Sequence, residues 1–256
     1  MSPAATSNCK WKLPYIRDHV LDSLLLPVPF IGVTETWFKP YISDAQVKLD
    51  GYNCFRADRE KRIGGGCALY VYEGLLVSKE FSYSDHSNNL VSCFINSMNT
   101  FIAVLYRPPK SQNKDFNSTL EILQRQIDEA NQSDKQPDIY ILGDFNLPSI
   151  DWEYCTVKSG VVCENPEATK LLLDFMDRNF FTQVVTKPTR GNNTLDLIFT
   201  NKPQDVLNVN CNETKLTEHR LVEALLGHNP ITKVESTFYT PYHRPTLFQI
   251  CRCPSS

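Results

Sequence analysis

Short apolar runs bounded by turn residues recur along this sequence and constrain its fold more than any other feature. Most runs are about five to seven residues long, which suits a buried strand and is short for a helix. The runs at 90–96 and 100–106 are separated only by Ser97-Met98-Asn99, so they predict a hairpin. In all, strands are expected over residues 30–34, 67–72, 90–96, 100–106, 138–142, 195–200 and 221–226.

Three helical patterns lie among these strands. Residues 11–26 place apolar side chains near helical spacing, although Pro14 interrupts them. Residues 115–132 are amphipathic, and residues 166–179 begin with a proline, which the first turn of a helix tolerates. The order is not a regular βαβ alternation. It predicts an α+β fold, a four-layer αββα sandwich of two packed mixed sheets with outer helices.

The chain has 256 residues, of which 41% are hydrophobic and 21% are charged. This composition is close to the globular average and allows one large domain with a sizeable core. We predict a single domain over residues 1–227. Residues 228–256 contain four prolines and little apolar periodicity, so a linker or an irregular C-terminal tail is expected there.

The formal net charge of −3 excludes a protein that coats nucleic acid through bulk positive charge. It still allows a local basic patch that holds DNA around an acidic metal site. The nine cysteines are odd in number and form no CxxC pair, which argues against a zinc site or a disulfide framework. We expect most of them to be small buried side chains in a reducing compartment.

The N-terminal residues lack the apolar segment of a signal peptide. The longest apolar stretch, residues 24–33, contains two prolines and is shorter than the roughly 20 residues that a membrane-spanning helix needs. We therefore expect an intracellular protein, nuclear or cytoplasmic, that is not secreted and does not enter a membrane.

Several polar residues lie where predicted strands end. Glu35 follows the strand at 30–34 and could hold a divalent ion, although most such glutamates are solvated surface groups. Asp144 and Asn146 follow the strand at 138–142 and point the same way if the strand geometry continues. They could orient a water and bind a phosphate oxygen, or they could build an Asx-rich turn, and the residues alone leave both open.

Asp196 stands among apolar strand residues, where an unpaired carboxylate is costly. His219 is its natural partner, because a carboxylate bonded to an imidazole fixes the tautomer and stabilises the charged ring. A water-facing aspartate and an ordinary surface histidine are the alternatives. Tyr106 ends the strand at 100–106, and it could contact a phosphate or be an ordinary half-buried tyrosine.

Five motifs occur in order along the chain: ETW at 35–37, RxxRxGGGxALYV at 59–71, YRPP at 106–109, GDFN at 143–146 and LDLIFTN at 195–201. They resemble the endonuclease domain of non-LTR retrotransposons. This is a branch of the endonuclease/exonuclease/phosphatase superfamily, which contains apurinic endonucleases and pancreatic deoxyribonuclease. The resemblance covers residues 8–226 and implies an αββα sandwich with one active site across the top of the two sheets.

The resemblance also implies an activity. The chain would be a magnesium-dependent DNA endonuclease, with manganese able to replace magnesium, and Glu35 would be the principal metal ligand. Its product would be a nick with a 3′-hydroxyl that primes reverse transcription. The implied partners are DNA and a reverse transcriptase domain of a longer parent polyprotein.

The same resemblance assigns roles to the other candidate residues. Tyr106 would contact the scissile phosphate. Asp144 would position or activate the attacking water, and Asn146 would help to bind phosphate. Asp196 would orient His219, which would bind or protonate the phosphate in the pentavalent state.

Two places depart from the family's pattern. The usual Ser-Asp-His is Thr217-Glu218-His219 here, and the extra methylene moves the carboxylate by roughly 1 Å, a misplacement that can cost ~100-fold in rate. Glu218 remains a candidate metal ligand. Family members usually open with a strand that carries a metal-binding asparagine. Asn8 is the matching candidate ligand, and the strand before it looks truncated.

Basic residues near the glycine run and just before Asp196 are candidates for holding DNA, with a solvated basic loop as the alternative. They are Arg59, Lys61, Arg62, Lys187 and Arg190. Three functions stay open: the nicking endonuclease, a catalytically impaired relic that keeps only the fold or DNA binding, and a small-molecule phosphoesterase of the same superfamily.

Overall fold

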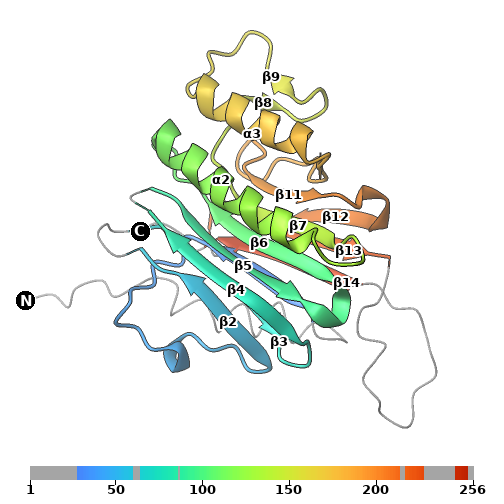
Figure 1. Cartoon of the computed structure of the whole chain (residues 1–256). Helices are drawn as coiled ribbons and strands as arrows, with labels where there is room; N and C mark the ends of the chain where they lie inside the picture. The colour runs from blue at the N-terminus through green and yellow to red at the C-terminus, as the bar shows by residue number, and fades with distance from the viewer. Residues whose placement is uncertain (1–27, 60–63, 86, 214–216, 228–245, 253–256) are drawn as a thin grey trace, which may run out of the picture.

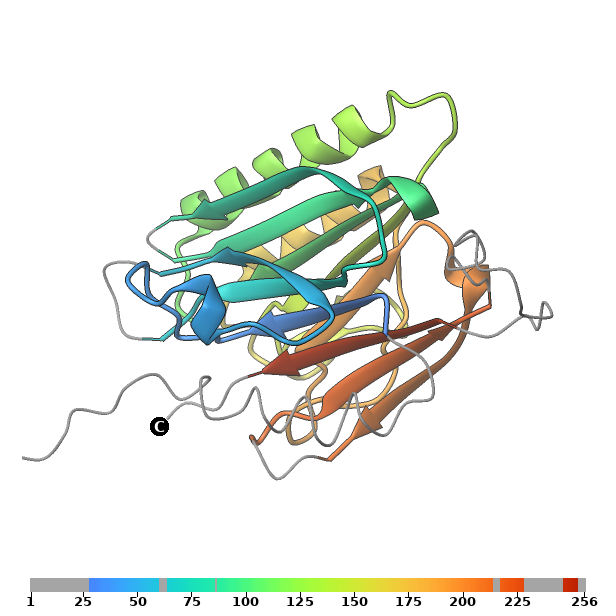
Figure 2. The ribbon, with the colours of Figure 1, turned by 90° about the horizontal axis from the view of Figure 1, so that it is seen from below.

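The computed structural model describes residues 28–59, 64–85, 87–213, 217–227 and 246–252, the last of these by the course of the backbone. Two six-stranded sheets pack face to face, and two helices cover the outer face of one of them (Figure 1 and Figure 2). A short hairpin of β8 (Ile150–Asp151) and β9 (Thr156–Val157) is separate from both sheets.

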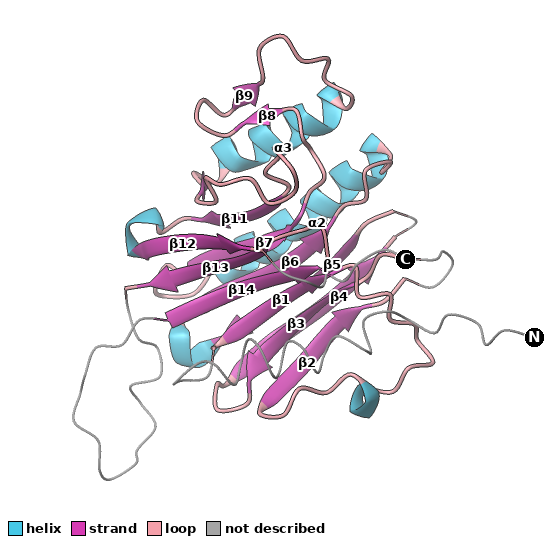
Figure 3. Cartoon of the chain, turned by 180° about the vertical axis from the view of Figure 1, so that it is seen from behind, coloured by secondary structure: helices cyan, strands magenta, loops and turns pink. Residues whose placement is uncertain are grey.

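Figure 3 views the molecule from behind and shows the first sheet. Its order is β12 (Val206–Asn212), β13 (Leu221–Leu226), β14 (Thr246–Arg252), β1 (Phe30–Thr34), β3 (Cys67–Tyr72) and β2 (Tyr52–Ala57). Neighbouring strands are antiparallel except β14 and β1, which are parallel. The sheet is therefore mixed, and its central strands come from opposite ends of the chain.

The second sheet has the order β10 (Thr182–Gln183), β11 (Asp196–Thr200), β7 (Asp138–Asp144), β6 (Thr100–Tyr106), β5 (Asn89–Ile95) and β4 (Val77–Ser84). Its pairs are antiparallel except β6 and β7, which are parallel. The ends of β6 and β7 therefore lie side by side, next to the start of the antiparallel β11.

Two amphipathic helices, α2 (Asn113–Ala130) and α3 (Pro166–Arg178), lie on the outer face of the second sheet. Each buries the apolar side chains that recur at helical spacing along one face. For α2 these include Phe116, Leu120, Leu123 and Ile127, and for α3 they include Leu172, Phe175 and Met176.

The core has three apolar layers. One lies between the sheets, where Phe30 and Leu69 of the first sheet face Val104 and Leu142 of the second. Another lies between the second sheet and the helices. The third covers the outer face of the first sheet, where residues 35–51 pack against it and include the 3-10 helix η3 (Asp44–Gln46). The two other described 3-10 turns are η4 (Asn96–Met98) and η5 (Pro203–Asp205).

The predicted two-sheet αββα sandwich is confirmed, with α2 and α3 forming the helical layer on the second sheet. All seven predicted strands are present, including the hairpin of β5 and β6, and the helices predicted over 115–132 and 166–179 are α2 and α3. The helix predicted over residues 11–26 lies outside the described residues.

The irregular tail predicted over residues 228–256 is wrong in one part. Residues 246–252 form β14, which pairs with β13 on one side and with β1 on the other. The prediction failed because it used only the local periodicity of the segment. The strand forms because it pairs with two strands that are distant in the sequence. The predicted domain over residues 1–227 stays a prediction.

No described helix is both long and apolar enough to cross a membrane. Six cysteines lie in the part of the chain described with side chains, and all six are free thiols. Cys67 and Cys93 are buried, Cys54, Cys163 and Cys211 are half-buried, and Cys155 is exposed. Burial in the apolar core raises the pKa of the Cys93 thiol to about 12, so this thiol is inert at neutral pH.

Candidate active site

The candidate residues gather where strands of both sheets end. Glu35 directly follows β1, Tyr106 is the last residue of β6, Asp144 is the last of β7 and Asp196 is the first of β11. Tyr106 pairs with Asp144 across β6 and β7, and Asp144 pairs with Asp196 across β7 and β11. Residues paired in register have side chains on the same face of a sheet, so these three lie in a row on the face turned toward the first sheet.

Glu35 is a buried carboxylate held by three donors. The indole Nε1 of Trp37 donates to Oε2 at 2.6 Å, and the backbone N–H of Gly65 donates to the same oxygen at 3.0 Å. The hydroxyl of Tyr106 donates to Oε1. Together these bonds fix the direction of the carboxylate. Glu35 and Trp37 both have positive φ, 55° and 57°, so the chain after β1 makes a sharp, strained turn here.

The three glycines at Gly64–Gly66 lie in close contact with this turn. All three glycines have positive φ, and a Cβ on Gly66 would lie 2.4 Å from Oγ1 of Thr36. Backbone N–H groups of Trp37 and Thr36 donate to the carbonyls of Gly65 and Gly66. Only glycine fits such a conformation and such a contact. The close packing of this segment against the turn after β1 therefore explains the three consecutive glycines in the sequence.

Asp144 and Asn146 lie on a tight turn after β7. A Cβ on Gly143 would lie 1.8 Å from the carbonyl oxygen of Leu105, so the strand can pass β6 at this point only with glycine. Asn146 has a φ of 50°, and its backbone N–H donates to Oδ1 of Asp144 at 3.1 Å. The local geometry is therefore the Asx turn that was the alternative interpretation. The side chains of Asp144 and Asn146 are nevertheless both buried at the site.

Asp196 and His219 form the predicted pair. Nδ1 of His219 lies 2.7 Å from Oδ2 of Asp196, and both side chains are almost fully buried. The hydroxyl of Thr189 accepts the backbone N–H of Asp196 at 3.0 Å, and a β-bridge between Arg190 and His219 fixes the histidine segment. The water-facing aspartate and the surface histidine, the two alternatives for this pair, are excluded by their burial.

Among the described residues, one group of side chains could hold a metal ion. Ligand atoms of Asp144, Asp196 and His219 lie within 4.8 Å of one another. Oδ1 of Asp196 is buried and has no hydrogen-bond partner among the described residues, and a buried carboxylate oxygen without a partner is costly unless a cation or water satisfies it. The two carboxylates suit a hard divalent ion such as magnesium, whereas an imidazole suits softer metals. Asp144 and Asp196 therefore fit the implied metal, and His219 is left for another contact.

The residues predicted as metal ligands are placed differently, and neither Glu35 nor Glu218 belongs to this group. The side chain of Glu218 is 79% exposed and forms an ion pair with Arg190 at 2.8 Å, and it is not part of the three-residue group. Asn8 lies outside the described residues. Both assignments stay predictions.

The candidate DNA-binding residues are scattered. Arg59 is buried, and its Nη2 donates to the carbonyl of Ser87 at 2.8 Å, which gives this side chain a structural contact. Lys187 is exposed, and Arg190 is half-exposed at the rim of the site. Lys61 and Arg62 lie outside the described residues. A DNA-binding role for these residues stays a prediction.

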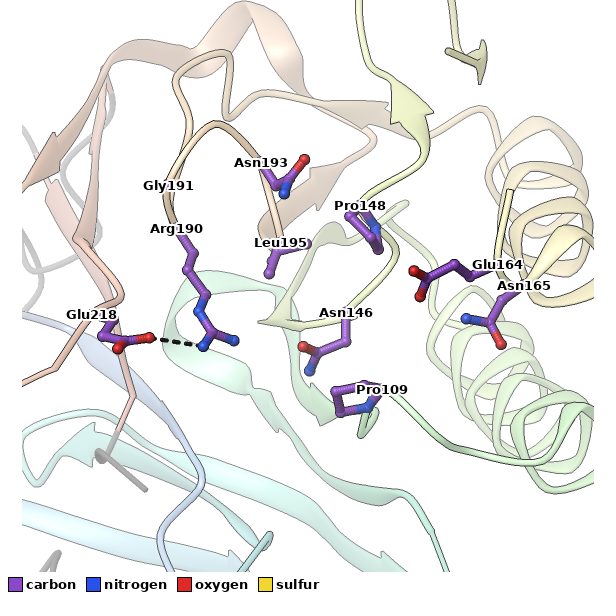
Figure 4. A pocket seen from close by; sticks show the side chains of 10 residues that line it. All are labelled: Pro109, Asn146, Pro148, Glu164, Asn165, Arg190, Gly191, Asn193, Leu195 and Glu218. Carbon is purple, nitrogen blue, oxygen red and sulfur yellow. Dashed lines mark hydrogen bonds and ion pairs between the residues drawn. The ribbon is translucent and has the colours of Figure 1, made fainter. Parts of the chain in front are cut away.

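A pocket of about 540 Å³ opens beside the site (Figure 4). Asn146 lies at its edge, and the Arg190–Glu218 ion pair closes one side. The opposite side is formed by Glu164 and Asn165, just before α3. The remaining lining residues are Pro109, Pro148, Gly191, Asn193 and Leu195. Of the candidate catalytic residues, Asn146 alone lines this pocket, so the pocket meets the site at that side chain.

Residues 100–223 match the model of a family described as Endonuclease-reverse transcriptase. The match includes Tyr106, Asp144, Asn146, Asp196 and His219, all placed at one edge of the sandwich. Over residues 100–223 this chain is similar to the endonuclease/exonuclease/phosphatase superfamily. Members of the superfamily are hydrolytic phosphoesterases, and the acidic group of this chain is consistent with that chemistry.

Solved structures of the superfamily share the fold. A 3′-5′ exonuclease from Neisseria meningitidis has a TM-score of 0.58 at 14% identity, over 86% of this chain and 97% of that chain. An apurinic endonuclease from Leishmania major has a TM-score of 0.57 at 14% identity, over 83% and 82%. The catalytic domain of human Nocturnin has a TM-score of 0.51 at 13% identity, over 86% and 80%. No curated protein matches the sequence.

Sequence reasoning missed three residues that support the superfamily site. Trp37 and Arg107 stand inside the quoted ETW and YRPP motifs, so their positions were signalled, but their contacts with Glu35 and with the Gly143–Asn146 turn were not. Thr189, which accepts the N–H of Asp196, carries no motif signal. Contacts of this kind depend on how distant loops meet, which a linear pattern does not reveal.

Proposed function

We propose that this chain is a magnesium-dependent DNA endonuclease that nicks target DNA for retrotransposition, leaving a 3′-hydroxyl that primes reverse transcription. The Endonuclease-reverse transcriptase match and the five ordered motifs support this choice within the superfamily. The single observation that carries it is the convergence of Asp144, Asp196 and His219 at an edge where Tyr106 also reaches Glu35. DNA is the proposed substrate, with a reverse transcriptase domain of a longer polyprotein as the proposed partner.

The geometry supports a different role for each residue around one phosphate. Asp144, buried and directed by its turn, takes a proton from the attacking water or orients it. Asn146 offers an amide to a phosphate oxygen. His219 is held by Asp196 through Nδ1, which leaves Nε2 to donate to the charged phosphoryl group.

Glu35, with the carboxylates of Asp144 and Asp196, would hold the divalent ion. When bound, magnesium supplies charge stabilisation for the phosphoryl and leaving oxygens. The chain's part is to fix the Glu35 carboxylate, which its bonds to Trp37 and Gly65 do. Tyr106 ties this carboxylate to the phosphate-binding strand end.

The test is a plasmid-nicking assay with purified protein and magnesium. Supercoiled DNA should become open-circular, and chelation of the metal should stop the reaction. The variants Asp144→Asn and His219→Ala should each lower the nicking rate by ~100-fold or more. Equal nicking by wild type and both variants would mean that the activity comes from elsewhere.

A catalytically impaired domain is the second candidate, favoured by one observation. The Glu218 carboxylate is exposed and paired with Arg190 instead of joining the acidic group. If wild type is inert and Glu218→Asp nicks plasmid, the chain is a damaged enzyme. If both are inert but the wild type retards DNA in a gel, it keeps only DNA binding. Competition by small phosphate esters, with DNA left intact, would instead indicate a small-molecule phosphoesterase.

A further inference from the structure

We propose that Arg107 is a positioning residue of this site. Its guanidinium holds the Gly143–Asn146 turn from the helix side, so that Asp144 and Asn146 present their side chains to the phosphate. The proposal rests on the proposed function, because it concerns the same site. It assigns to the second residue of the YRPP motif a role that neither the motif nor the family match supplies.

The burial of Arg107 is the first observation. Its side chain is completely buried, and it heads the described fully buried side chains in size. Its Cζ lies 5.1 Å from the centroid of the Phe116 ring of α2, so the guanidinium lies between the turn and the helix. Burial lowers the pKa of Arg107 to about 10, which shows how costly the site is for a charge. A buried guanidinium needs compensating contacts.

The contacts of Arg107 are almost all with one turn. Nη1 donates to the carbonyl oxygens of Phe145 at 3.3 Å and of Asn146 at 3.4 Å. The backbone N–H of Arg107 donates to the carbonyl of Asp144 at 2.9 Å. In return, Nδ2 of Asn146 donates to the carbonyl of Arg107 at 2.8 Å. Arg107 thus bonds to three successive residues of the turn.

The turn needs such a clamp because of its conformation. Asn146 has a φ of 50°, in the left-handed region, and Gly143 passes within contact of the Leu105 carbonyl. The carbonyls of Phe145 and Asn146, both buried residues, accept from Nη1 of Arg107. A buried carbonyl requires a donor, and Nη1 of Arg107 supplies it to both.

Arginine suits the task better than any replacement. Its guanidinium reaches the turn through Nη1 while its planar group lies over the Phe116 ring, whereas the lysine ammonium has no planar group to stack. Nε and Nη2 have no hydrogen-bond partner among the described residues, and the Asp144 carboxylate favours the charged form of the guanidinium. The contacts of the Arg107 guanidinium are those of a clamp on the Gly143–Asn146 turn.

The experiment compares Arg107→Met and Arg107→Lys with the wild type. We expect kcat for nicking to fall by ~100-fold in Arg107→Met, because a displacement of about 1 Å costs that much, and to fall less in Arg107→Lys. KM for DNA should stay within about threefold, since Arg107 makes no outward contact. The control is Ile127→Ala, which opens a cavity in the same apolar layer near the other end of α2. It should lower the melting temperature without lowering kcat.

Hydrogen exchange of the full chain gives a second readout that does not need activity. The amides of Phe145 and Asn146 should exchange faster in both Arg107 variants, while those of α3 stay protected. Unchanged exchange of the turn, or unchanged kcat in a folded Arg107→Met, overturns the positioning role. An inert wild type whose turn loosens in the variants overturns the proposed function and leaves the clamp standing.

Discussion

The hydroxyl of Tyr106 donates to Oε1 of Glu35, and this bond joins the two sheets at the edge where the candidate site lies. Tyr106 belongs to the second sheet, and Glu35 follows a strand of the first. The carboxylate that would hold a metal is thus fixed by the strand that would hold the phosphate. Removing this bond should affect activity more than it affects the fold.

Tyr106→Phe should lower the nicking rate by about 10-fold or more, because a hydrogen bond to a charged group contributes roughly 1.5–3 kcal/mol. Nicking kinetics and thermal unfolding measure the two effects. Tyr70→Phe is the matched control, since the Tyr70 hydroxyl is also buried and donates to the carbonyl of Val47 at 2.8 Å, on the outer face of the first sheet. Equal nicking by both variants would speak against a role for the Tyr106–Glu35 bond.

Asp196→Asn should reduce the single-turnover nicking rate by ~100-fold or more. The amide cannot stabilise a charged His219 ring as the carboxylate at 2.7 Å does, and it can favour the wrong tautomer. Asp151→Asn changes the same functional group in the β8–β9 turn, where Oδ1 accepts the N–H of Glu153 at 3.0 Å, and it should leave the rate unchanged. A fully active Asp196→Asn protein would remove His219 from the mechanism.

Magnesium should raise the melting temperature of the wild type, because an ion that binds only the folded state at 100 times its Kd adds about 2.7 kcal/mol. Glu35→Gln and Asp144→Asn should lose most of this increase. Glu218→Gln should keep it, because the Glu218 carboxylate is exposed and pairs with Arg190. Loss of the increase in Glu218→Gln would instead make Glu218 a ligand, as the motif position suggests.

Gly143→Ala should destabilise the protein by ~3 kcal/mol or more and abolish nicking. Its Cβ would lie 1.8 Å from the Leu105 carbonyl, so β6 and β7 would have to separate at the site. Gly160→Ala is the control: this glycine also has positive φ, 73°, but no atom lies within 4 Å of the added Cβ. Its cost should be about 1–2 kcal/mol with full activity. Urea denaturation and the nicking assay distinguish the two variants.

Removing residues 246–256 should unfold or aggregate the protein, because β13 and β1 would each lose a partner and present open edges inside the first sheet. Removing only residues 253–256 keeps every pair of β14 and should change the melting temperature little. Circular dichroism and size-exclusion chromatography provide the measurement. A well-folded chain that ends at residue 245 would support the domain boundary predicted at 227.

The sequence predicts the central strands well because burial on both faces leaves continuous apolar runs, as at Phe30–Thr34 and Thr100–Tyr106. It fails for strands with weaker patterns. β4 (Val77–Ser84) is an edge strand with mostly exposed side chains, and β12 (Val206–Asn212) alternates with polar residues. β14 follows a stretch that contains three prolines, and its partners are far away in the chain.

The site follows a similar rule. Asp144 and Asp196 could be found because each interrupts or ends an apolar strand, and the strand register then brings them together. The surroundings of Arg59 could not be foreseen. A basic residue before a glycine run suggests a DNA contact, whereas the fold buries it against the carbonyl of Ser87. The direction taken by Glu218 depends on Arg190, which the linear sequence does not pair with it.

The position of β14 has a consequence for how the molecule is made. A ribosome delivers β1 early and β13 late, yet these two strands become neighbours of one sheet only through residues 246–252. The second sheet and its helices are complete by residue 200 and can condense while synthesis continues. The half of the sandwich that carries Glu35 must wait, so a nascent chain would bring Asp144 and Asp196 together before Glu35 is fixed beside Tyr106.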